Sequence, residues 1–191
     1  MRLVDLNMLE HLQGFLCVRG IGNIEDAGDV EKAKLRNKQS LTDLKLNFSQ
    51  DTEPHKTDHE LEVLLDAFQP PPNLKYLQIS TYNGATFPNW MVSLVNLRCL
   101  ILFSCANCEF LPPLGRLPSL EILHMFHMDK VEKVGLEFLG VETGRKALGL
   151  ATISPHVAAL RLKLWWQFQS LFCSHDQVKH QVVQYCLIIQ P

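Results

Sequence analysis

A seven-residue stretch occurs three times in this chain: NLKYLQI at 73–79, NLRCLIL at 96–102 and SLEILHM at 119–125. The copies are 23 residues apart and align without a gap. Leucine fills the second and fifth positions of every copy, and the seventh is Ile79, Leu102 or Met125. Three matched apolar columns at one spacing indicate tandem copies of one structural unit.

The pattern L-x-x-L-x-L at this spacing is the leucine-rich repeat signature. One such unit cannot bury its own apolar face, so the units must stack. We therefore predict an α/β solenoid, a horseshoe with a short parallel sheet on its concave face and helical or irregular segments on its convex face. Parallel strands are expected around Leu44, Leu77, Leu100 and Leu123.

Looser repeats precede the regular ones. Asp26 is placed to cap a short helix that begins near residue 27. Residues 49–72 form an insertion whose second half has leucines at helical spacing, with Asp58 as the expected N-cap. Pro70, Pro71 and Pro72 end that helix because proline cannot continue it.

Composition narrows the possible classes of protein. Of the 191 residues, 47% are apolar and the formal net charge is −2, which argues against the basic stripe of a nucleic-acid binder. Residues 1–18 lack the features of a signal peptide, and no apolar run reaches the ~18 residues of a membrane span. The six cysteines are therefore expected as reduced thiols in a cytoplasmic protein.

The chain divides into three expected parts. Residues 1–140 form the leucine-rich repeat region. Residues 141–164 form a degenerate repeat that contains Val157, Leu160 and Leu162 at the repeat spacing. Residues 165–191 form a divergent tail without repeat register, for which disorder is one expectation. Trp165 and Trp166 fit either an aromatic anchor for a partner or a cover for the last repeat.

Several strings in this chain are idiosyncratic, among them QPPPNLK at 69–75 and LPPLGRLPSLE at 111–121. Together with the repeat phase, they resemble the leucine-rich repeat region of plant intracellular immune receptors of the coiled-coil, nucleotide-binding type over about residues 10–140. The resemblance implies a protein-recognition or autoinhibitory module in defence against pathogens. A P-loop is missing, since Gly144-Arg145-Lys146 lacks both the partner glycine and a following Ser or Thr. We therefore expect a fragment without the nucleotide-binding domain.

Two groupings suggest chemistry, and both have simpler interpretations. Cys105, Cys108, His124 and His127 resemble a zinc set, but Cys105 fills the Asn/Cys position of the repeat consensus. Cys173 with His175 or His180 lacks an orienting third group in a formed pocket. We predict no metal site, no cofactor and no enzymatic activity.

Strand alternation assigns the faces of the predicted sheet. Leu77, Leu100 and Leu123 point into the core, so their neighbours line the concave face. The predicted partner-binding residues are Tyr76, Gln78, Cys99, Ile101, Phe103, Ile122, His124 and Phe126. The expected partner is a protein: the nucleotide-binding domain of the parent receptor or a pathogen effector. The alternative hypothesis is a structural remnant of a truncated or misread resistance gene, without a binding role.

Overall fold

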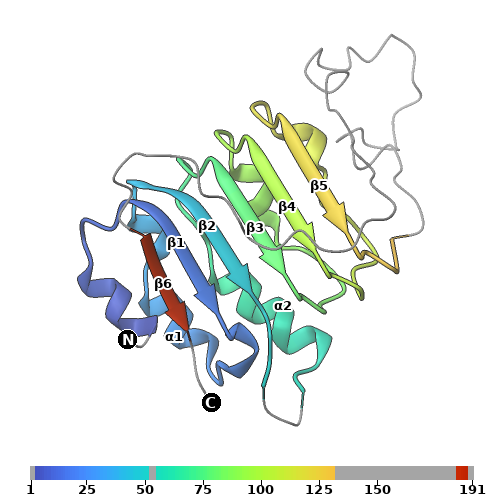
Figure 1. The fold of residues 1–191 in the computed structure, drawn as a ribbon, viewed down its shortest axis with the longest axis horizontal. Coiled ribbons are helices and arrows are strands. Elements are labelled where there is room, and N and C mark those ends of the chain that lie inside the picture. Colours follow the sequence, from blue (N-terminus) through green and yellow to red (C-terminus); the bar gives the residue numbers. More distant parts are fainter. Residues whose placement is uncertain (1–2, 52–54, 132–183, 189–191) are drawn as a thin grey trace.

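The computed structural model describes residues 3–51, 55–131 and 184–188. Within them, all strands are parallel and form one sheet in the order β5-β4-β3-β2-β1-β6 (Figure 1). The strands are β1 Gly14–Arg19, β2 Leu41–Asn47, β3 Tyr76–Ser80, β4 Cys99–Phe103, β5 Ile122–Phe126 and β6 Gln184–Ile188. The predicted strands around Leu44, Leu77, Leu100 and Leu123 are therefore confirmed.

The sheet register follows the sequence repeat. Leu77 pairs with Leu100, and Leu100 pairs with Leu123, each 23 residues further along the chain. These leucines are at most 2% exposed and stack as one column of the hydrophobic core. Each fully buried leucine contributes about 1.5–3 kcal/mol relative to its exposed state.

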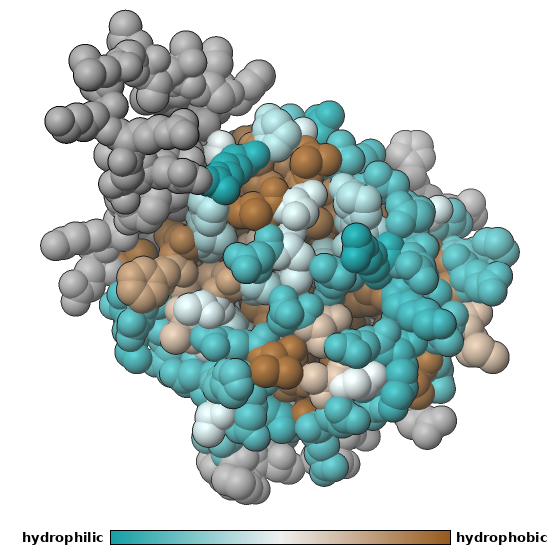
Figure 2. Space-filling view, turned by 180° about the vertical axis from the view of Figure 1, so that it is seen from behind, coloured by the Kyte–Doolittle hydropathy of each residue, from teal (hydrophilic) through white to brown (hydrophobic). Residues whose placement is uncertain are grey.

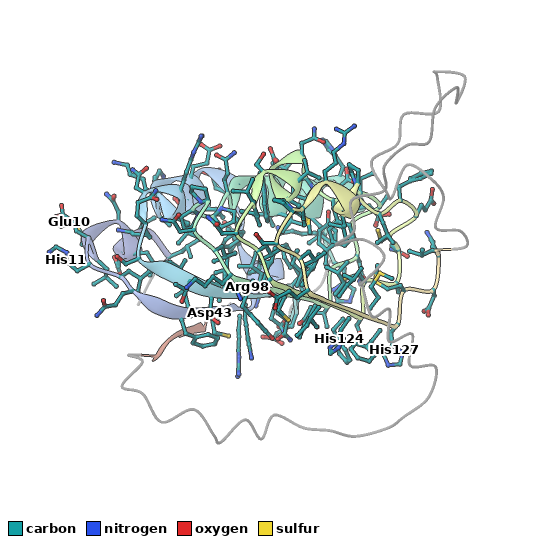
Figure 3. All side chains as sticks on the ribbon, turned by 90° about the horizontal axis from the view of Figure 1, so that it is seen from above. Glu10, His11, Asp43, Arg98, His124 and His127 are labelled. Carbon is teal, nitrogen blue, oxygen red and sulfur yellow. The ribbon has the colours of Figure 1, made fainter. Side chains whose placement is uncertain are left out.

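In the described residues, the helical segments lie on the convex side of the sheet, opposite the concave face (Figures 1 and 3). The α-helices are α1 Ala27–Lys32 and α2 Asp58–Ala67. Short 3₁₀ segments complete this side at Leu3–Met8, Ile21–Asn23, Leu35–Asn37, Asn89–Ser93 and Leu114–Arg116. The 23-residue units thus return through 3₁₀ turns, because their short connections leave no room for a full α-helix.

The two expected helix caps differ in outcome. Asp26 caps α1 as predicted, since its carboxylate accepts the Gly28 N–H at 2.8 Å. The prediction of Asp58 as the cap of α2 is wrong. Thr57 is the N-cap: its Oγ1 accepts the Glu60 N–H at 3.3 Å, and the Glu60 carboxylate accepts the Thr57 N–H at 2.8 Å. This reciprocal capping box satisfies two backbone donors at once.

Each regular strand ends at a residue with a left-handed backbone. Thr81, Ser104 and His127 directly follow β3, β4 and β5, with φ of 54°, 53° and 51°. The Thr81 N–H donates to the Phe103 carbonyl, and the Ser104 N–H donates to the Phe126 carbonyl. The sharp turn therefore extends the ladder by one bond and places these side chains at the rim of the concave face.

The strand β6 is a feature that the repeat pattern does not predict. It comes from the tail expected to be divergent, yet it pairs with β1 from Phe15↔Gln184 to Arg19↔Ile188. The degenerate repeat at 141–164, the tryptophan pair and the Cys173 grouping lie outside the described residues.

Candidate functional site

The concave face of the sheet is built from three rows of residues that cross β3, β4 and β5. The registers pair Tyr76 with Cys99 and Ile122, Gln78 with Ile101 and His124, and Ser80 with Phe103 and Phe126. All eight predicted site residues therefore share this face. Each is half-buried or exposed, in contrast to the buried leucines between them. Phe103 and Ile122 are 41% and 43% exposed, and they lie on this same face.

Aromatic rings gather at one end of this face. The Phe103 ring centroid lies 6.3 Å from that of Phe126 and 5.6 Å from that of His127, and the second pair is edge-to-face. The His124 ring meets the Phe126 ring at 5.8 Å, also edge-to-face. Figure 3 places His124 and His127 on the strand side of the molecule, away from the helices. We call Ile101, Phe103, Ile122, His124, Phe126 and His127 the aromatic patch.

His127 was missed as a site residue because it follows β5 rather than belonging to it. The alternation of side chains between the two faces of a sheet holds only within a strand, so it does not assign a face to a residue in a turn. The 23-residue phase could have found it, since His127 aligns with Ser104 and Thr81 at the strand ends.

The other end of the face is polar and internally bonded. The Tyr76 hydroxyl donates to Gln78 Oε1 at 2.9 Å, and Gln78 Nε2 donates to Ser80 Oγ at 3.1 Å. Lys45 Nζ lies 5.4 Å from the Phe15 ring centroid and 5.7 Å from that of Tyr76, within cation–π range. Sequence reasoning missed Phe15 and Lys45 because it considered only the three regular repeats. The face is thus polar over β2 and β3 and apolar over β4 and β5.

The four residues of the zinc-like grouping do not converge. Cys105 and Cys108 are fully buried in the core, whereas His124 and His127 lie on the concave side. Burial raises the pKa of the Cys105 thiol to about 12 and that of Cys108 to about 11, which favours the neutral thiol over the metal-binding thiolate. Within residues 3–51, 55–131 and 184–188, no three His, Cys, Asp or Glu side chains are grouped to hold a metal.

A polar groove runs across the amino-terminal ends of the strands. It encloses about 400 Å³ and is lined by Thr42, Asn73, Lys75, Asn96, Arg98 and Ser119. The Asn96 amide donates to the Pro72 carbonyl at 3.2 Å, and Arg98 pairs with Glu121 at 3.2 Å. These two contacts link residues 24 and 23 positions apart. The polar side chains along the groove therefore connect each repeat to the next one.

The helical side differs from the concave face in its surface. Figure 2 shows that face as mostly hydrophilic, with hydrophobic residues in small separate areas. Among the described residues, no helix has the length and apolarity to cross a membrane.

Comparison with known proteins gives consistent matches. A model of the family described as R13L1/DRL21 LRRs matches residues 3–128. The chain is 30% identical over 146 residues to an Arabidopsis thaliana protein named as disease resistance RPP13-like protein 1. Two Solanum bulbocastanum proteins named as disease resistance proteins RGA1 and RGA4 are 34% and 33% identical to it, over 117 and 166 residues.

These matches cover 72%, 60% and 84% of this chain, but only 14%, 12% and 16% of the three relatives. The chain therefore spans about a seventh of the length of the curated relatives it matches.

Proposed function

Because the chain belongs to the R13L1/DRL21 family of leucine-rich repeats, we propose that it is a protein-recognition module of a plant immune receptor. Its relatives carry disease resistance in their names, which supports a role in defence. The module acts by protein–protein contact through its concave face, in the cytoplasm, and this role requires no catalytic group.

The aromatic patch is the observation that carries the proposal. Its side chains come from β4, β5 and the residue after β5, and strands about 4.8 Å apart bring neighbouring side chains together. The ring pairs of Phe103, His124, Phe126 and His127 connect the patch. Phe103 and Ile122 are each more than two-fifths exposed at its surface. Soluble proteins rarely leave such a patch uncovered, and aromatic side chains with polar surroundings are typical anchors of protein interfaces.

The partner we favour is the nucleotide-binding domain of the parent receptor, with a pathogen effector as a competing ligand. In that arrangement, the repeats hold the receptor inactive until the effector displaces the domain. The polar half of the face, with Lys45 between two aromatic rings, supplies charge contacts at the border of the interface. Charged border contacts contribute more to specificity and association rate than to affinity.

A pair of substitutions tests this proposal. Ile101→Lys with Phe126→Lys places two charges within the aromatic patch but outside the core. We expect the double variant to fold normally and to lose association with a co-expressed nucleotide-binding domain from a receptor of the same type. Co-purification measures association, and circular dichroism with thermal melting measures folding.

The matched control adds two lysines elsewhere. Val63→Lys with Val95→Lys replaces apolar side chains that are 45% and 48% exposed and lie outside the concave face. The control should retain association. If Ile101→Lys with Phe126→Lys retained association, or if both double variants lost it equally, the aromatic patch would not be the binding surface.

A further inference from the structure

The loop that follows β3 carries a chemically reactive dipeptide, Asn83-Gly84. Asn83 is the one asparagine of the chain that precedes a glycine, and each of the others precedes a larger residue. Residues 81–88 belong to no helix or strand, and Asn83 is exposed. We propose that Asn83 is a site of spontaneous deamidation, and that the isoaspartate formed there weakens the packing around the buried Tyr82.

The two reacting groups lie side by side in the chain. Deamidation begins when the backbone nitrogen of the following residue attacks the side-chain amide carbon of the asparagine. Gly84 has no Cβ to obstruct this approach, and a glycine backbone reaches conformations that other residues avoid. Within the described residues, neither the Asn83 side chain nor the Gly84 N–H makes a hydrogen bond. Neither group must therefore give up a partner before it reacts.

Other asparagines are held in place. Asn47 Oδ1 accepts the Ser49 N–H at 2.8 Å. The Asn96 amide donates to the Pro72 carbonyl at 3.2 Å. Such a side chain must leave its partner and turn before its amide carbon can be attacked, and the larger residue that follows it hinders the attack further. Asn83 should therefore react first.

The reaction consumes one water and releases one ammonia. The Gly84 nitrogen loses its proton and bonds to Asn83 Cγ, and the amide nitrogen leaves as ammonia, which closes a succinimide ring. Water then opens the ring. Cleavage of the bond to Cγ gives aspartate with a normal backbone. Cleavage of the bond to the backbone carbonyl carbon gives isoaspartate, whose main chain runs through the side chain and is longer by one carbon.

The additional backbone carbon enters a tightly packed turn. A Cβ added to Gly84 would lie 2.2 Å from the Tyr82 hydroxyl oxygen, so there is no free space on that side. The same hydroxyl donates to the Thr86 carbonyl at 2.6 Å. The Tyr82 ring is fully buried, with its centroid 5.0 Å from that of Phe48. A longer backbone at residue 83 should displace this turn and disturb the core beneath it, because close-packed interiors tolerate little added volume.

The loop also joins the core to its neighbours. The Thr86 N–H and hydroxyl each donate to Glu62 Oε1 of α2 at 2.9 Å. The Ala85 carbonyl accepts the Glu109 N–H from the next repeat at 3.1 Å. Displacement of the loop should therefore loosen both α2 and the connection to the following repeat.

The experiment incubates the purified full chain in mildly alkaline buffer under native conditions and samples it over weeks. Peptide mapping by mass spectrometry follows the replacement of an amide by a carboxyl group, and protein isoaspartate methyltransferase labels the isoaspartate. We expect residue 83 to react several-fold faster than any other asparagine, and the isoaspartate fraction to melt at a lower temperature. A native chain that stays unmodified at residue 83, or that reacts first at another asparagine, would overturn the proposal.

Two variants separate the chemistry from its consequence. Asn83→Gln should stay unmodified at this position and keep a constant melting temperature, because its longer side chain closes a larger ring more slowly. Fresh Asn83→Asp should melt with the wild type, because it has the charge of the product on a normal backbone. If Asn83→Asp were as unstable as the isoaspartate fraction, or if that fraction melted with the wild type, the effect assigned to the longer backbone would be wrong.

Discussion

Cys105 illustrates how a single residue joins two repeats. Its sulfur lies 3.7 Å from the Phe103 carbonyl oxygen and 4.0 Å from the Ile79 carbonyl oxygen, so it contacts both its own strand and the preceding one. The side chain is fully buried. Its role is structural, as its position in the repeat consensus predicted.

Burial of Cys105 should make the protein sensitive to alkali. Burial raises the pKa of its thiol from 9.0 to about 12, so the folded state keeps a proton that the unfolded state loses above pH 9. Stability should therefore be complete below about pH 9 and fall above it, by about 1.4 kcal/mol per pH unit for this group. Denaturant unfolding from pH 8 to 11 measures this slope.

The Cys105→Ala variant is the comparison for that slope. It removes the titrating group, so its stability should fall less steeply above pH 9 than that of the wild type. Equal slopes for the two proteins would show that the Cys105 thiol does not contribute to alkaline destabilisation.

At the scale of one element, β4 separates the core from the concave face by alternation alone. Leu100 and Leu102 are fully buried, whereas Ile101 is half-buried and Phe103 is exposed. Neighbouring residues of similar size and polarity therefore lie in different environments, one row in the core and the other on the concave face.

A matched pair of substitutions tests this division. Leu100→Asp places a charge in the core between two repeats and should cost roughly 3–5 kcal/mol. Ile101→Asp adds the same side chain on the concave face and should cost about 1 kcal/mol. Thermal and denaturant unfolding compare the two, and a Leu100→Asp variant as stable as wild type would contradict the strand register.

The start of α2 offers a second test at this scale. Thr57→Ala removes the side chain that accepts the Glu60 N–H and should cost about 1 kcal/mol. Asp58→Ala removes a favourable charge in the first turn and a long 3.4 Å hydrogen bond that Asn107 Nδ2 donates to Asp58 Oδ1, and it should cost less, about 0.5 kcal/mol. Urea unfolding measures both, and a larger cost for Asp58→Ala would restore Asp58 as the cap.

At the scale of the whole molecule, the stability of each repeat depends on its interfaces with the adjacent repeats, because a repeat contacts mainly those next to it. β3 has a strand on each side, whereas β5 has one neighbour within the described residues. A strand with two neighbours should open less often than one with a single neighbour.

Hydrogen exchange should therefore differ along the sheet. Amides of Tyr76–Ser80 should exchange more slowly than those of Ile122–Phe126, as measured by mass spectrometry of the native protein. Equal protection of the two strands would mean that another segment also pairs with the outer edge of β5.

Much of the site could be predicted because it repeats. The 23-residue phase placed all eight predicted residues on one face, from Tyr76 to Phe126. Their role in binding stays a prediction. The phase could not place Lys45 between two rings, since that contact joins strands from the less regular repeats.

The sequence by itself determined the solenoid, its strand register and the separation of core from concave face. These features follow from the local spacing of apolar residues, and the same spacing occurs in every regular repeat. Only the tertiary structure decided that Thr57 caps α2, that His127 joins the aromatic patch and that residues 184–188 pair with β1. A cap depends on the exact backbone of one turn, and a pairing between distant segments depends on long-range packing, so neither leaves a periodic signal in the chain.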